Sequence, residues 1–432
     1  MIVGQFLRNK LFWVLDAVKG SKNRLHYNEI VMSMNKNYEI DKPKIENILA
    51  HAVSTTNYYS KFNKSSLNDF PIINKNIIRE NKDGFLSNSF TDQQRVYLTT
   101  SGSTGTPFKV FYDANKRIRN YADTLYFAEL SGYKLGIRLY YLKIWNVANM
   151  KNKIISFLQN IIPVDVLNID KEGPEVRNQF SNNKNPIALL GYVSALETLS
   201  RQIYRENKKI NYKVVSIITM SESLDSESKK NIEKAFLCEA HSRYSNIENG
   251  ILAQQTSLCP NEFLINTASY HIEIFDTNED KIVPHGELGR IVVTDFYNKA
   301  MPLIRYDTGD LGILNVRKIN GIDRLVFSVV EGRKLDQIFN TKGELISSYI
   351  VYRNMWKYTE INQYQFIQKS KNQYVFKVSM LEQFTREEEL INEFKEYLGF
   401  DADFKIEYVN EIPLLNSGKR KKVINEMNLV SK

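Results

Sequence analysis

The strongest local signal in the chain is the stretch Thr99-Thr100-Ser101-Gly102-Ser103-Thr104-Gly105-Thr106-Pro107-Phe108-Lys109. It lies between two runs rich in β-forming residues, Val96–Leu98 and Phe108–Tyr112, so it predicts a loop that joins two strands. Glycines permit tight turns, and the hydroxyl and N–H groups of such a turn can bind phosphate oxygens. The candidate phosphate-binding residues are Ser101, Gly102, Ser103, Thr104 and Gly105, with Lys109 as a nearby positive charge. On these residues alone, a flexible surface loop is an equally good interpretation.

The composition is that of a water-soluble globular protein. The chain has 432 residues, of which 43% are hydrophobic and 25% charged, enough for one large domain and a smaller one. Two cysteines exclude a disulfide framework and favour a reducing compartment. No uncharged apolar run is long enough to span a bilayer, and Arg8, Lys10 and Asp16 interrupt the N-terminal apolar stretch, which is therefore not a signal peptide. We expect a cytoplasmic protein.

The charge balance does not indicate a nucleic-acid partner. The chain has 58 basic and 49 acidic residues, a net charge of +9, and the basic residues are spread along its whole length. Nucleic-acid binding needs a clustered basic face, and no fold of that kind is recognisable. Anionic small molecules or an anionic membrane surface explain the excess equally well.

Residues 1–60 are predicted to be helical. Apolar residues recur at spacings of three and four, at Phe6, Leu7, Leu11, Leu15 and Val18. Such a helix can lie on a membrane surface or pack onto its own domain. Packing onto the domain is the commoner arrangement for a segment of this length, and we expect it here.

From about Val96 the pattern predicts an α/β protein. Helices are expected over 194–205 and 226–237, the second capped by Asp225 or Ser226, and a β-hairpin or meander over 270–296. After Glu331 the pattern changes to a polar β-hairpin over 363–381, a helix over 385–398 capped by Thr385, and a last strand over 404–409. We therefore predict a large N-terminal α/β domain, residues 1–331, and a small mobile α+β domain, residues 332–432, with a hinge near 332–336.

The phosphate-binding stretch resembles the signature of the adenylate-forming acyl ligases, in the form used by the phenylacetate–CoA ligase and CapK-like branch. Four further segments resemble this branch in order: 51–59, 70–75, Leu190–Leu196 in place of a Gly-Tyr-Pro-Ser segment, and Met220–Leu224 in place of a Ser-Gly-Glu segment. Ser221 stands at the glycine position of the last of these. The resemblance implies that Glu222 contributes to the nucleotide site and that Tyr192 and Gly250 line the acyl pocket.

Two more motifs of the family bear on ATP. Tyr244-Ser245-Asn246-Ile247-Glu248 resembles the Tyr-Gly-x-Thr/Ser-Glu motif, which implies that Tyr244 lies against adenine and that Glu248 holds Mg²⁺. The departures are serine for glycine and isoleucine for the hydroxyl residue. The segment 304–311 closely resembles the Tyr-x-Thr-Gly-Asp motif, whose aspartate, Asp310, would accept hydrogen bonds from both ribose hydroxyls.

The last two motifs concern the small domain. Gly332-Arg333 resembles the hinge motif, and Arg333 would contact the nucleotide. Where many relatives carry Asp or Lys at the pivot, this chain has Leu335 followed by Asp336. The segment 412–419 resembles the final Pro-x-x-x-Ser-Gly-Lys motif, so Lys419 would reach the α-phosphate and the attacking carboxylate.

The resemblance implies an ATP- and Mg²⁺-dependent ligase that forms an acyl-AMP and passes the acyl group to an amine, a sugar or coenzyme A. Segment 340–347 lacks the Arg-Gly-x-Asn-Val-Phe-Pro signature of the branch's CoA ligases, which favours a CapK-like enzyme of surface-polysaccharide synthesis. An aryl-acid CoA ligase and a non-catalytic nucleotide-binding homologue are the alternatives. A zinc site at Cys238, His241, Cys259 and His271 matches no common spacing. The oligomeric state and the identity of the acid stay open.

Overall fold

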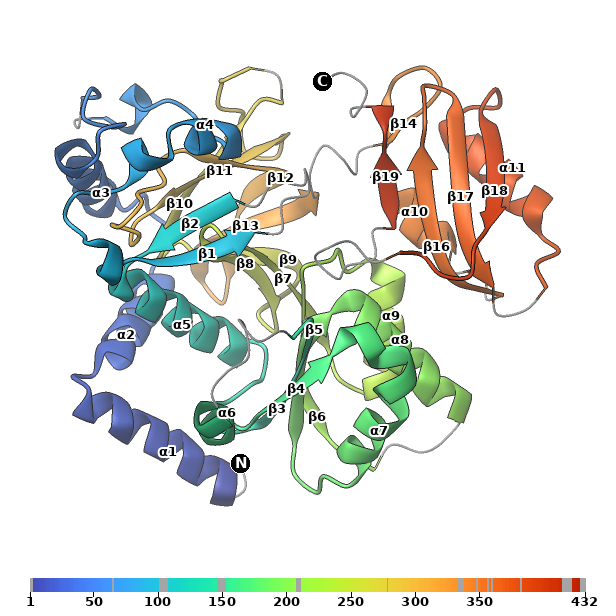
Figure 1. Cartoon of the computed structure of the whole chain (residues 1–432), viewed down its shortest axis with the longest axis horizontal. Coiled ribbons are helices and arrows are strands. Elements are labelled where there is room, and N and C mark those ends of the chain that lie inside the picture. Colours follow the sequence, from blue (N-terminus) through green and yellow to red (C-terminus); the bar gives the residue numbers. More distant parts are fainter. Residues whose placement is uncertain are drawn as a thin grey trace.

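A computed structural model describes residues 3–63, 66–100, 108–145, 153–206, 211–277, 279–331, 338–346, 349–355, 357–358, 360–380, 383–413 and 422–427. The chain forms a large α/β part and a separate C-terminal sheet domain (Figure 1). The predicted α/β class, with a large sheet and a second, smaller sheet domain, is confirmed. The predicted boundary at 331/332 adjoins residues 332–337, which lie outside the described part, so it stays a prediction.

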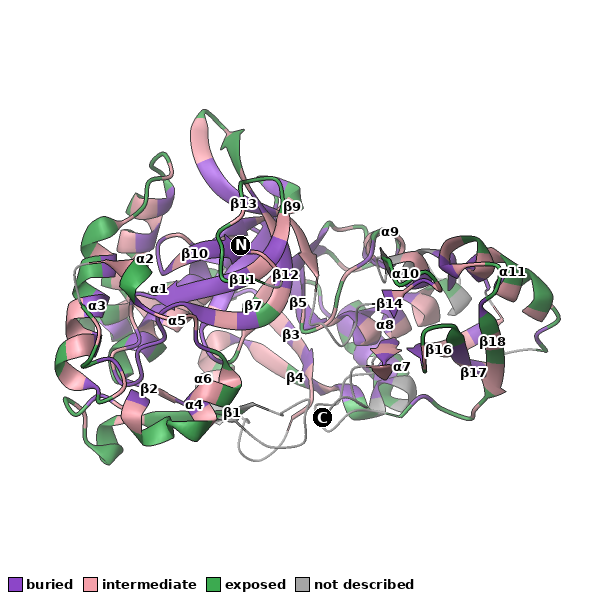
Figure 2. Cartoon of the chain, turned by 90° about the horizontal axis from the view of Figure 1, so that it is seen from above, coloured by how far each residue is buried: buried purple, intermediate pink, exposed green. Residues whose placement is uncertain are grey.

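The large part is built on one eleven-stranded sheet in the order β10-β11-β12-β13-β9-β8-β7-β6-β5-β3-β4. One half is parallel and contains β3 (Arg138–Lys143), β4 (Ile161–Asp165), β5 (Ile187–Tyr192), β6 (Val214–Met220) and β7 (Ala240–Asn246). The other half is antiparallel and contains β8 (Gly250–Thr256), β9 (Cys259–Ile265), β10 (Tyr270–Phe275), β11 (Leu288–Asp295), β12 (Tyr306–Ile319) and β13 (Ile322–Glu331). Buried residues concentrate along these strands (Figure 2).

Helices cover the sheet and its edges. They are α1 (Val3–Val18), α2 (Lys22–Met34), α3 (Lys42–Thr55), α4 (Lys75–Glu80), α5 (Ala114–Glu129), α6 (Lys153–Gln159), α7 (Ile169–Ser181), α8 (Val193–Glu206) and α9 (Ser226–Phe236). Short 3-10 helices are η1 (Leu67–Asp69), η2 (Lys82–Phe85), η3 (Asp92–Gln94) and η4 (Val166–Asn168). Apolar residues of α7, α8 and α9 share one buried core with β3, β5 and β6. Asp225 caps α9 by accepting from Glu227 N and Ser228 N, as predicted.

The two strands predicted around the serine- and glycine-rich stretch form an antiparallel ribbon. They are β1 (Val96–Thr100) and β2 (Phe108–Tyr112), paired from Val96↔Tyr112 to Thr100↔Phe108. The candidate phosphate-binding residues Ser101–Gly105 connect these strands and lie outside the described residues.

The C-terminal sheet domain has the four-stranded order β18-β17-β16-β19. Its elements are β14 (Ile338–Phe339), β15 (Leu345–Ile346), α10 (Tyr349–Met355), β16 (Ile361–Gln368), β17 (Gln373–Met380), α11 (Glu387–Leu398), β18 (Asp403–Tyr408) and β19 (Val423–Asn425). The predicted hairpin is confirmed as β16–β17. The predicted cap of α11 is wrong, because its N-cap is Arg386, which makes no side-chain cap. Three glutamates in the first turn favour the helix N-terminus instead.

The first helix packs onto its own domain, as expected, but not through the apolar residues noted in the sequence. Within α1, Phe6, Leu7, Leu11, Leu15 and Val18 are all exposed. The polar side chains of Gln5 and Asn9 face the domain, together with Phe12 and Trp13. Among the described residues, no helix combines the length and apolar character needed to cross a bilayer.

Candidate active site

Three predicted site residues lie at the carboxyl ends of neighbouring parallel strands. The register pairs Tyr192 at the end of β5 with Met220 at the end of β6, and Met220 with Arg243 of β7. Glu222 follows β6 by two residues, and Tyr244 follows Arg243. The carboxyl edge of a parallel sheet is where α/β proteins bind ligands. The structure thus brings these three residues, predicted from separate motifs, to one edge of the sheet.

Tyr244 and Asp310 are joined directly. The Tyr244 hydroxyl donates to Asp310 Oδ2 at 2.8 Å and lies 3.3 Å from Thr308 Oγ1. Burial and the negative charge of Asp310 raise the pKa of Tyr244 well above its ordinary value, so the phenol stays protonated and acts as a donor. Gly309 between the two motif residues has a φ of +81°, a conformation that favours glycine. The turn and the tyrosine together orient the Asp310 carboxylate.

Glu248 is buried in the turn between β7 and β8, residues 246–250, which we call the Glu248 loop. Its side chain is 3% exposed and forms an ion pair with the ammonium group of Lys75. The loop is fixed through its backbone, since the Tyr112 hydroxyl donates to Ile247 O and the Tyr270 hydroxyl donates to Asn249 O at 2.6 Å. A buried carboxylate held in place supplies the oxygen ligands that a hard cation such as Mg²⁺ prefers, and in this structure the Lys75 ammonium group is the cation beside it.

Gly250 ends the Glu248 loop with a φ of +117°. A Cβ atom there would lie 2.9 Å from Asn120 Oδ1 and 3.0 Å from the Tyr270 hydroxyl, so the position requires glycine for both conformation and space. This local requirement accounts for the glycine; its predicted role in the acyl pocket stays a prediction.

A buried pair of charges is connected to the Glu248 loop through the Tyr270 hydroxyl. Lys116 of α5 and Asp295 of β11 are both fully buried, with Lys116 Nζ 2.6 Å from Asp295 Oδ2. Lys116 Nζ also donates to the Tyr270 hydroxyl at 3.1 Å, and that hydroxyl holds Asn249 O. The charge pair, Tyr270 and the loop backbone therefore form one connected chain of hydrogen bonds.

Lys75 reaches the site through an added strand-like segment. Ile73 pairs in parallel with Tyr306, with Ile73 N donating to Arg305 O at 3.0 Å and Asp307 N donating to Ile73 O at 2.8 Å. Two residues further on, Lys75 begins α4, which Asn74 caps. Lys75 is the last residue of the segment 70–75 that resembles the family, and the resemblance gives it no role. The basic residue at the end of this segment is the feature of the sequence from which a role in the site could have been predicted.

Glu222 binds the start of α8. Its carboxylate accepts from Ser194 N at 2.7 Å and from Ser194 Oγ at 3.0 Å. A carboxylate at a helix N-terminus is stabilised by the helix dipole. The preceding Ser221 has a φ of +70°, which explains why the family carries glycine at this position. Burial and the Glu222 charge raise the pKa of Tyr192 to about 12.

The structure does not bring every predicted residue to this edge. Lys109 is exposed on the β1–β2 ribbon with its ammonium 4.9 Å from the Tyr97 ring centroid, and none of its contacts in the described part of the chain reaches the strand ends. Arg333, Leu335, Asp336 and Lys419 lie outside the described residues.

Two residues of the C-terminal sheet domain contact α8 of the large part, Lys422 and Asn362. Lys422 Nζ lies 3.1 Å from Glu197 Oε2, and Arg201 Nη1 donates to Asn362 O at 2.8 Å. Burial alone would raise the pKa of Glu197, but the charges of Lys422 and Arg201 and a hydrogen bond from Ser228 hold it below its ordinary value. Glu197 therefore stays ionised. This pair could not be predicted from the sequence, because its members are 225 residues apart.

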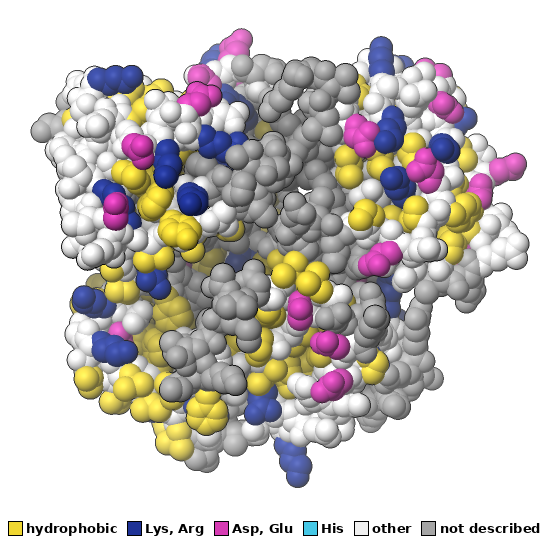
Figure 3. All heavy atoms as spheres, in the orientation of Figure 1, with side chains coloured by type: hydrophobic (Ala, Val, Ile, Leu, Met, Phe, Trp, Pro, Cys, Tyr) yellow, Lys and Arg dark blue, Asp and Glu magenta, His cyan; other side chains and the backbone are white. Residues whose placement is uncertain are grey.

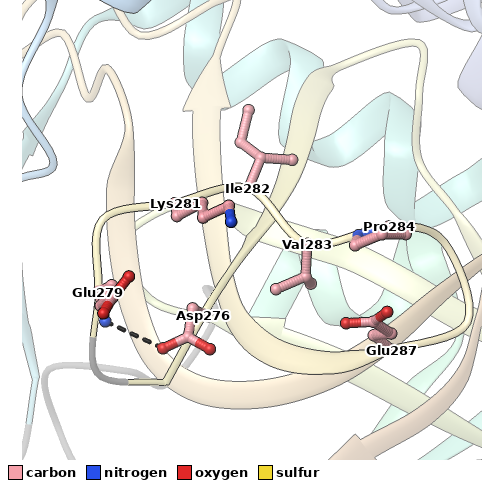
Figure 4. A pocket seen from close by; sticks show the side chains of 7 residues that line it. All are labelled: Asp276, Glu279, Lys281, Ile282, Val283, Pro284 and Glu287. Atoms are coloured by element: carbon pink, nitrogen blue, oxygen red, sulfur yellow. Dashed lines mark hydrogen bonds between the residues drawn. The ribbon is translucent and has the colours of Figure 1, made fainter.

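A hollow of about 400 Å³ lies elsewhere, on the connection between β10 and β11 (Figure 4). It is lined by Asp276, Glu279, Lys281, Ile282, Val283, Pro284 and Glu287. It shares no residue with the predicted site, and Glu279 N donates to Asp276 Oδ1 at 3.0 Å across its rim. Within the residues that the structure describes, no group of three histidine, cysteine or acidic side chains is arranged to hold a metal.

The fold defines the class of protein to which the chain is similar, that of the adenylate-forming ligases. The structure of a 2-hydroxyisobutyryl-CoA ligase in the postadenylation state, with an acyl-AMP, matches 90% of this chain and 89% of its own with a TM-score of 0.71 and 14% identity. An amide bond synthetase, McbA from Marinactinospora thermotolerans, matches 77% of this chain and 68% of its own with a TM-score of 0.54 and 15% identity.

Sequence comparison points to a particular branch. The chain is 23% identical over 445 residues to Protein CapK of Staphylococcus aureus, covering 98% of this chain and 96% of that protein. Residues 338–426 match the family model of the CapK C-terminal domain. The predicted resemblance to the CapK-like branch of the adenylate-forming ligases is confirmed.

Proposed function

We propose that the chain is an ATP-dependent ligase that activates a carboxylate as its acyl-AMP and passes the acyl group to an acceptor in the synthesis of a capsule or another surface polysaccharide. The observation that supports this most is the meeting of Tyr244–Asp310 and Lys75–Glu248 near the carboxyl ends of the parallel strands. One pair suits a ribose and the other suits a metal-bound triphosphate.

The nucleotide would be held by residues of the large part. Asp310, oriented by Tyr244, would accept hydrogen bonds from the ribose hydroxyls. Glu248 would hold Mg²⁺, which neutralises triphosphate charge when it is bound. Lys75 neutralises Glu248 in the structure as it stands and would turn toward the phosphates when the metal takes its place. The loop Ser101–Gly105, with Lys109, would also bind the phosphates.

In the first half-reaction a substrate carboxylate oxygen would form a bond to the α-phosphorus of ATP as the bond to the pyrophosphate oxygen breaks. Lys419 would stabilise the charge that develops on the attacking and phosphate oxygens, and Arg333 would contact the nucleotide. In the second half-reaction the acceptor would bond to the acyl carbon and AMP would leave.

The arrangement of the two sheets supports the first half-reaction as the one this conformation serves. The same 2-hydroxyisobutyryl-CoA ligase matches with a TM-score of 0.71 in its postadenylation state and 0.56 in its thioesterification state with CoA. Two states of one protein differ mainly in arrangement, so the higher score favours an adenylation-type position of the C-terminal sheet domain here. Lys422–Glu197 would then stabilise that position.

The acceptor and the location in the cell are proposed from the sequence. The acceptor would be an amine or a sugar, with coenzyme A as the alternative of an aryl-acid CoA ligase. We place the protein in the cytoplasm, in peripheral contact with a membrane or with the machinery of polysaccharide synthesis. A non-catalytic nucleotide-binding homologue would lack the first half-reaction altogether.

Carboxylate-dependent exchange between ATP and pyrophosphate tests the proposal. The panel contains aryl acids, amino acids and sugar uronic acids, and AMP release is then measured with CoA, amines or sugars as acceptors. We expect exchange with at least one acid, its loss in Lys419→Ala and Glu248→Gln, and no change in the exposed control Lys371→Ala. ATP binding without exchange for any acid, or full exchange in Lys419→Ala, would contradict the proposal.

A further inference from the structure

The inner side of α1 combines polar side chains with the two aromatic residues Phe12 and Trp13. Gln5 Nε2 donates to Pro186 O at 3.0 Å and Asn9 Nδ2 donates to Leu135 O at 3.1 Å. Asp16 is buried and accepts from Asn23 N at 3.1 Å and Arg24 N at 3.0 Å at the start of α2. These bonds need polar side chains on the inner face, so they fix which side of the helix faces the domain.

The outer side of α1 is aliphatic. Its residues recur at the three- and four-residue spacing of one helix face, and they are Leu7 (59% exposed), Leu11 (44%), Val14 (57%), Leu15 (39%) and Val18 (79%). We call this set the α1 outer face. In the space-filling view, hydrophobic side chains gather over α1 at the lower left (Figure 3). A contiguous exposed apolar patch marks an interaction site.

The helix is held closely enough that it cannot roll to bury this face. A Cβ atom at Gly136, which has a φ of +101°, would lie 2.2 Å from Gln5 O. Phe12 contacts Tyr121 with ring centroids 5.7 Å apart, and Trp13 contacts Tyr27 at 5.9 Å. Exposure of the α1 outer face is therefore a property of the packed fold.

Positive charges surround the α1 outer face. Between residues 3 and 25 the sequence has five basic residues, Arg8, Lys10, Lys19, Lys22 and Arg24, and one acidic residue, Asp16. Asp16 is buried and accepts a hydrogen bond from Arg24 N at the start of α2, so it does not offset the basic residues at the surface. Two of the guanidinium groups lie over aromatic rings, Arg8 at 5.1 Å from Phe157 and Arg24 at 4.4 Å from Trp13.

We propose that the α1 outer face binds the surface of an anionic lipid bilayer, with the aliphatic residues in the headgroup region and the flanking basic residues on the lipid phosphates. An exposed apolar stripe between basic side chains is the pattern of a helix that lies in a membrane interface. Pairing with a second copy of the chain through this face would bring two positively charged surfaces together, which opposes that arrangement. The proposal makes specific the peripheral membrane contact included in the proposed function.

Co-sedimentation of the full-length chain with vesicles tests this. Vesicles of phosphatidylcholine alone are compared with vesicles that also contain phosphatidylglycerol. We expect binding to the anionic vesicles that weakens as salt rises, and little binding to the neutral ones. The triple variant Leu11→Ser, Val14→Ser, Leu15→Ser should lower the partition coefficient by about 100-fold or more, because its apolar contacts are lost.

Charge is tested separately from apolar contact. The variant Lys10→Gln, Lys19→Gln, Lys22→Gln should weaken binding by about fivefold for each lysine at low salt. Two matched controls carry the same kinds of change at exposed residues elsewhere, namely Leu167→Ser, Ile282→Ser, Phe400→Ser and Lys36→Gln, Lys230→Gln, Lys371→Gln. Both controls should bind as the unchanged chain does.

Three results would overturn the proposal: no binding to either kind of vesicle, equal losses in the controls, or a dimer of the unchanged chain that the apolar variant converts to a monomer. ATP–pyrophosphate exchange without vesicles should be the same in all five proteins. A failure of membrane binding with exchange intact would refute this inference and leave the ligase proposal standing. Membrane binding without exchange would refute the ligase proposal and leave this inference standing.

Discussion

Two ion pairs of the molecule, Lys116–Asp295 and Lys422–Glu197, differ in what surrounds them. The first lies wholly inside the large part, with both side chains at 0% exposure, and supports the Glu248 loop through Tyr270. The second joins the C-terminal sheet domain to α8, and its lysine is 19% exposed. When the two parts separate, water can solvate both Lys422 and Glu197. If Lys116 is removed, no water reaches the buried carboxylate of Asp295. The large part is thus held by a pair that is closed to water, whereas the C-terminal sheet domain is held by a pair whose lysine water can reach.

Breaking the first pair should have the largest effect. In Lys116→Met the carboxylate of Asp295 stays buried without its partner, so we expect the free energy of unfolding of the large part to fall by about 3–5 kcal/mol. Urea unfolding followed by tryptophan fluorescence measures this. The control Lys405→Met removes an exposed pair with Glu407 and should change stability by less than about 1 kcal/mol. Similar values for the two variants would contradict the comparison.

The next largest effect should come from acid, which should lower the stability of the large part. All five histidines lie before residue 331, and burial lowers the pKa of His241 to about 4. The unfolded chain therefore takes up this proton first, near pH 6.5, so the stability of the large part should fall by up to about 3 kcal/mol between pH 6.5 and pH 4. Unfolding monitored at several pH values checks this. The variant His241→Phe should lose most of that pH dependence, and an unchanged slope would contradict the assignment.

Breaking the second pair should affect chemistry more than folding. Glu197→Gln keeps a hydrogen-bonding side chain but removes the charge facing Lys422, so we expect acyl-AMP formation to slow by about 10-fold, or about 1–2 kcal/mol, with ATP affinity unchanged. Single-turnover assays and equilibrium binding separate the two quantities. Lys422→Gln should give the same loss, and the double variant should lose no more. The control Glu262→Gln breaks an exposed pair with Arg317 and should leave the rate unaltered.

The smallest effect expected is on ATP affinity, from a change at Tyr244 in the large part. Tyr244→Phe removes one hydrogen bond to Asp310 while the ring keeps its place against Phe327, so ATP should bind about fivefold more weakly, a change of about 1 kcal/mol. Calorimetric titration with ATP measures this, and the exposed Tyr204→Phe serves as the control. Equal affinities in Tyr244→Phe and the unchanged chain would mean that the hydrogen bond from Tyr244 to Asp310 does not contribute to ATP binding.

Local patterns in the sequence predicted most elements correctly, including the β1–β2 ribbon, the cap of α9 and the β16–β17 hairpin. Family motifs predicted Tyr244 and Asp310 separately, and the structure joins them. The pairs Lys75–Glu248 and Lys422–Glu197 could not be predicted, because each depends on tertiary contact between residues far apart in the chain.

The first helix shows a different limit of sequence patterns. Helical periodicity correctly indicated that α1 has two unlike faces, but it does not tell which face lies inward. The inner face is selected by the carbonyl oxygens of Pro186 and Leu135, which come from distant loops and accept from Gln5 and Asn9. An average preference for burying apolar residues was therefore the wrong guide here.

The pairing of Ile73 with Tyr306 also has a consequence for synthesis of the chain. One apolar core combines Tyr59, Phe70 and Ile73 with Met301, Leu303 and Tyr306. More than 200 residues must leave the ribosome after the first group before the second emerges, which takes roughly 10 to 50 s at typical rates. During that time the early residues can contact one another, as Tyr59 contacts Phe70, but they lack the part of their core that Met301, Leu303 and Tyr306 supply. The nascent chain should therefore depend on chaperones until the start of β12 has been made.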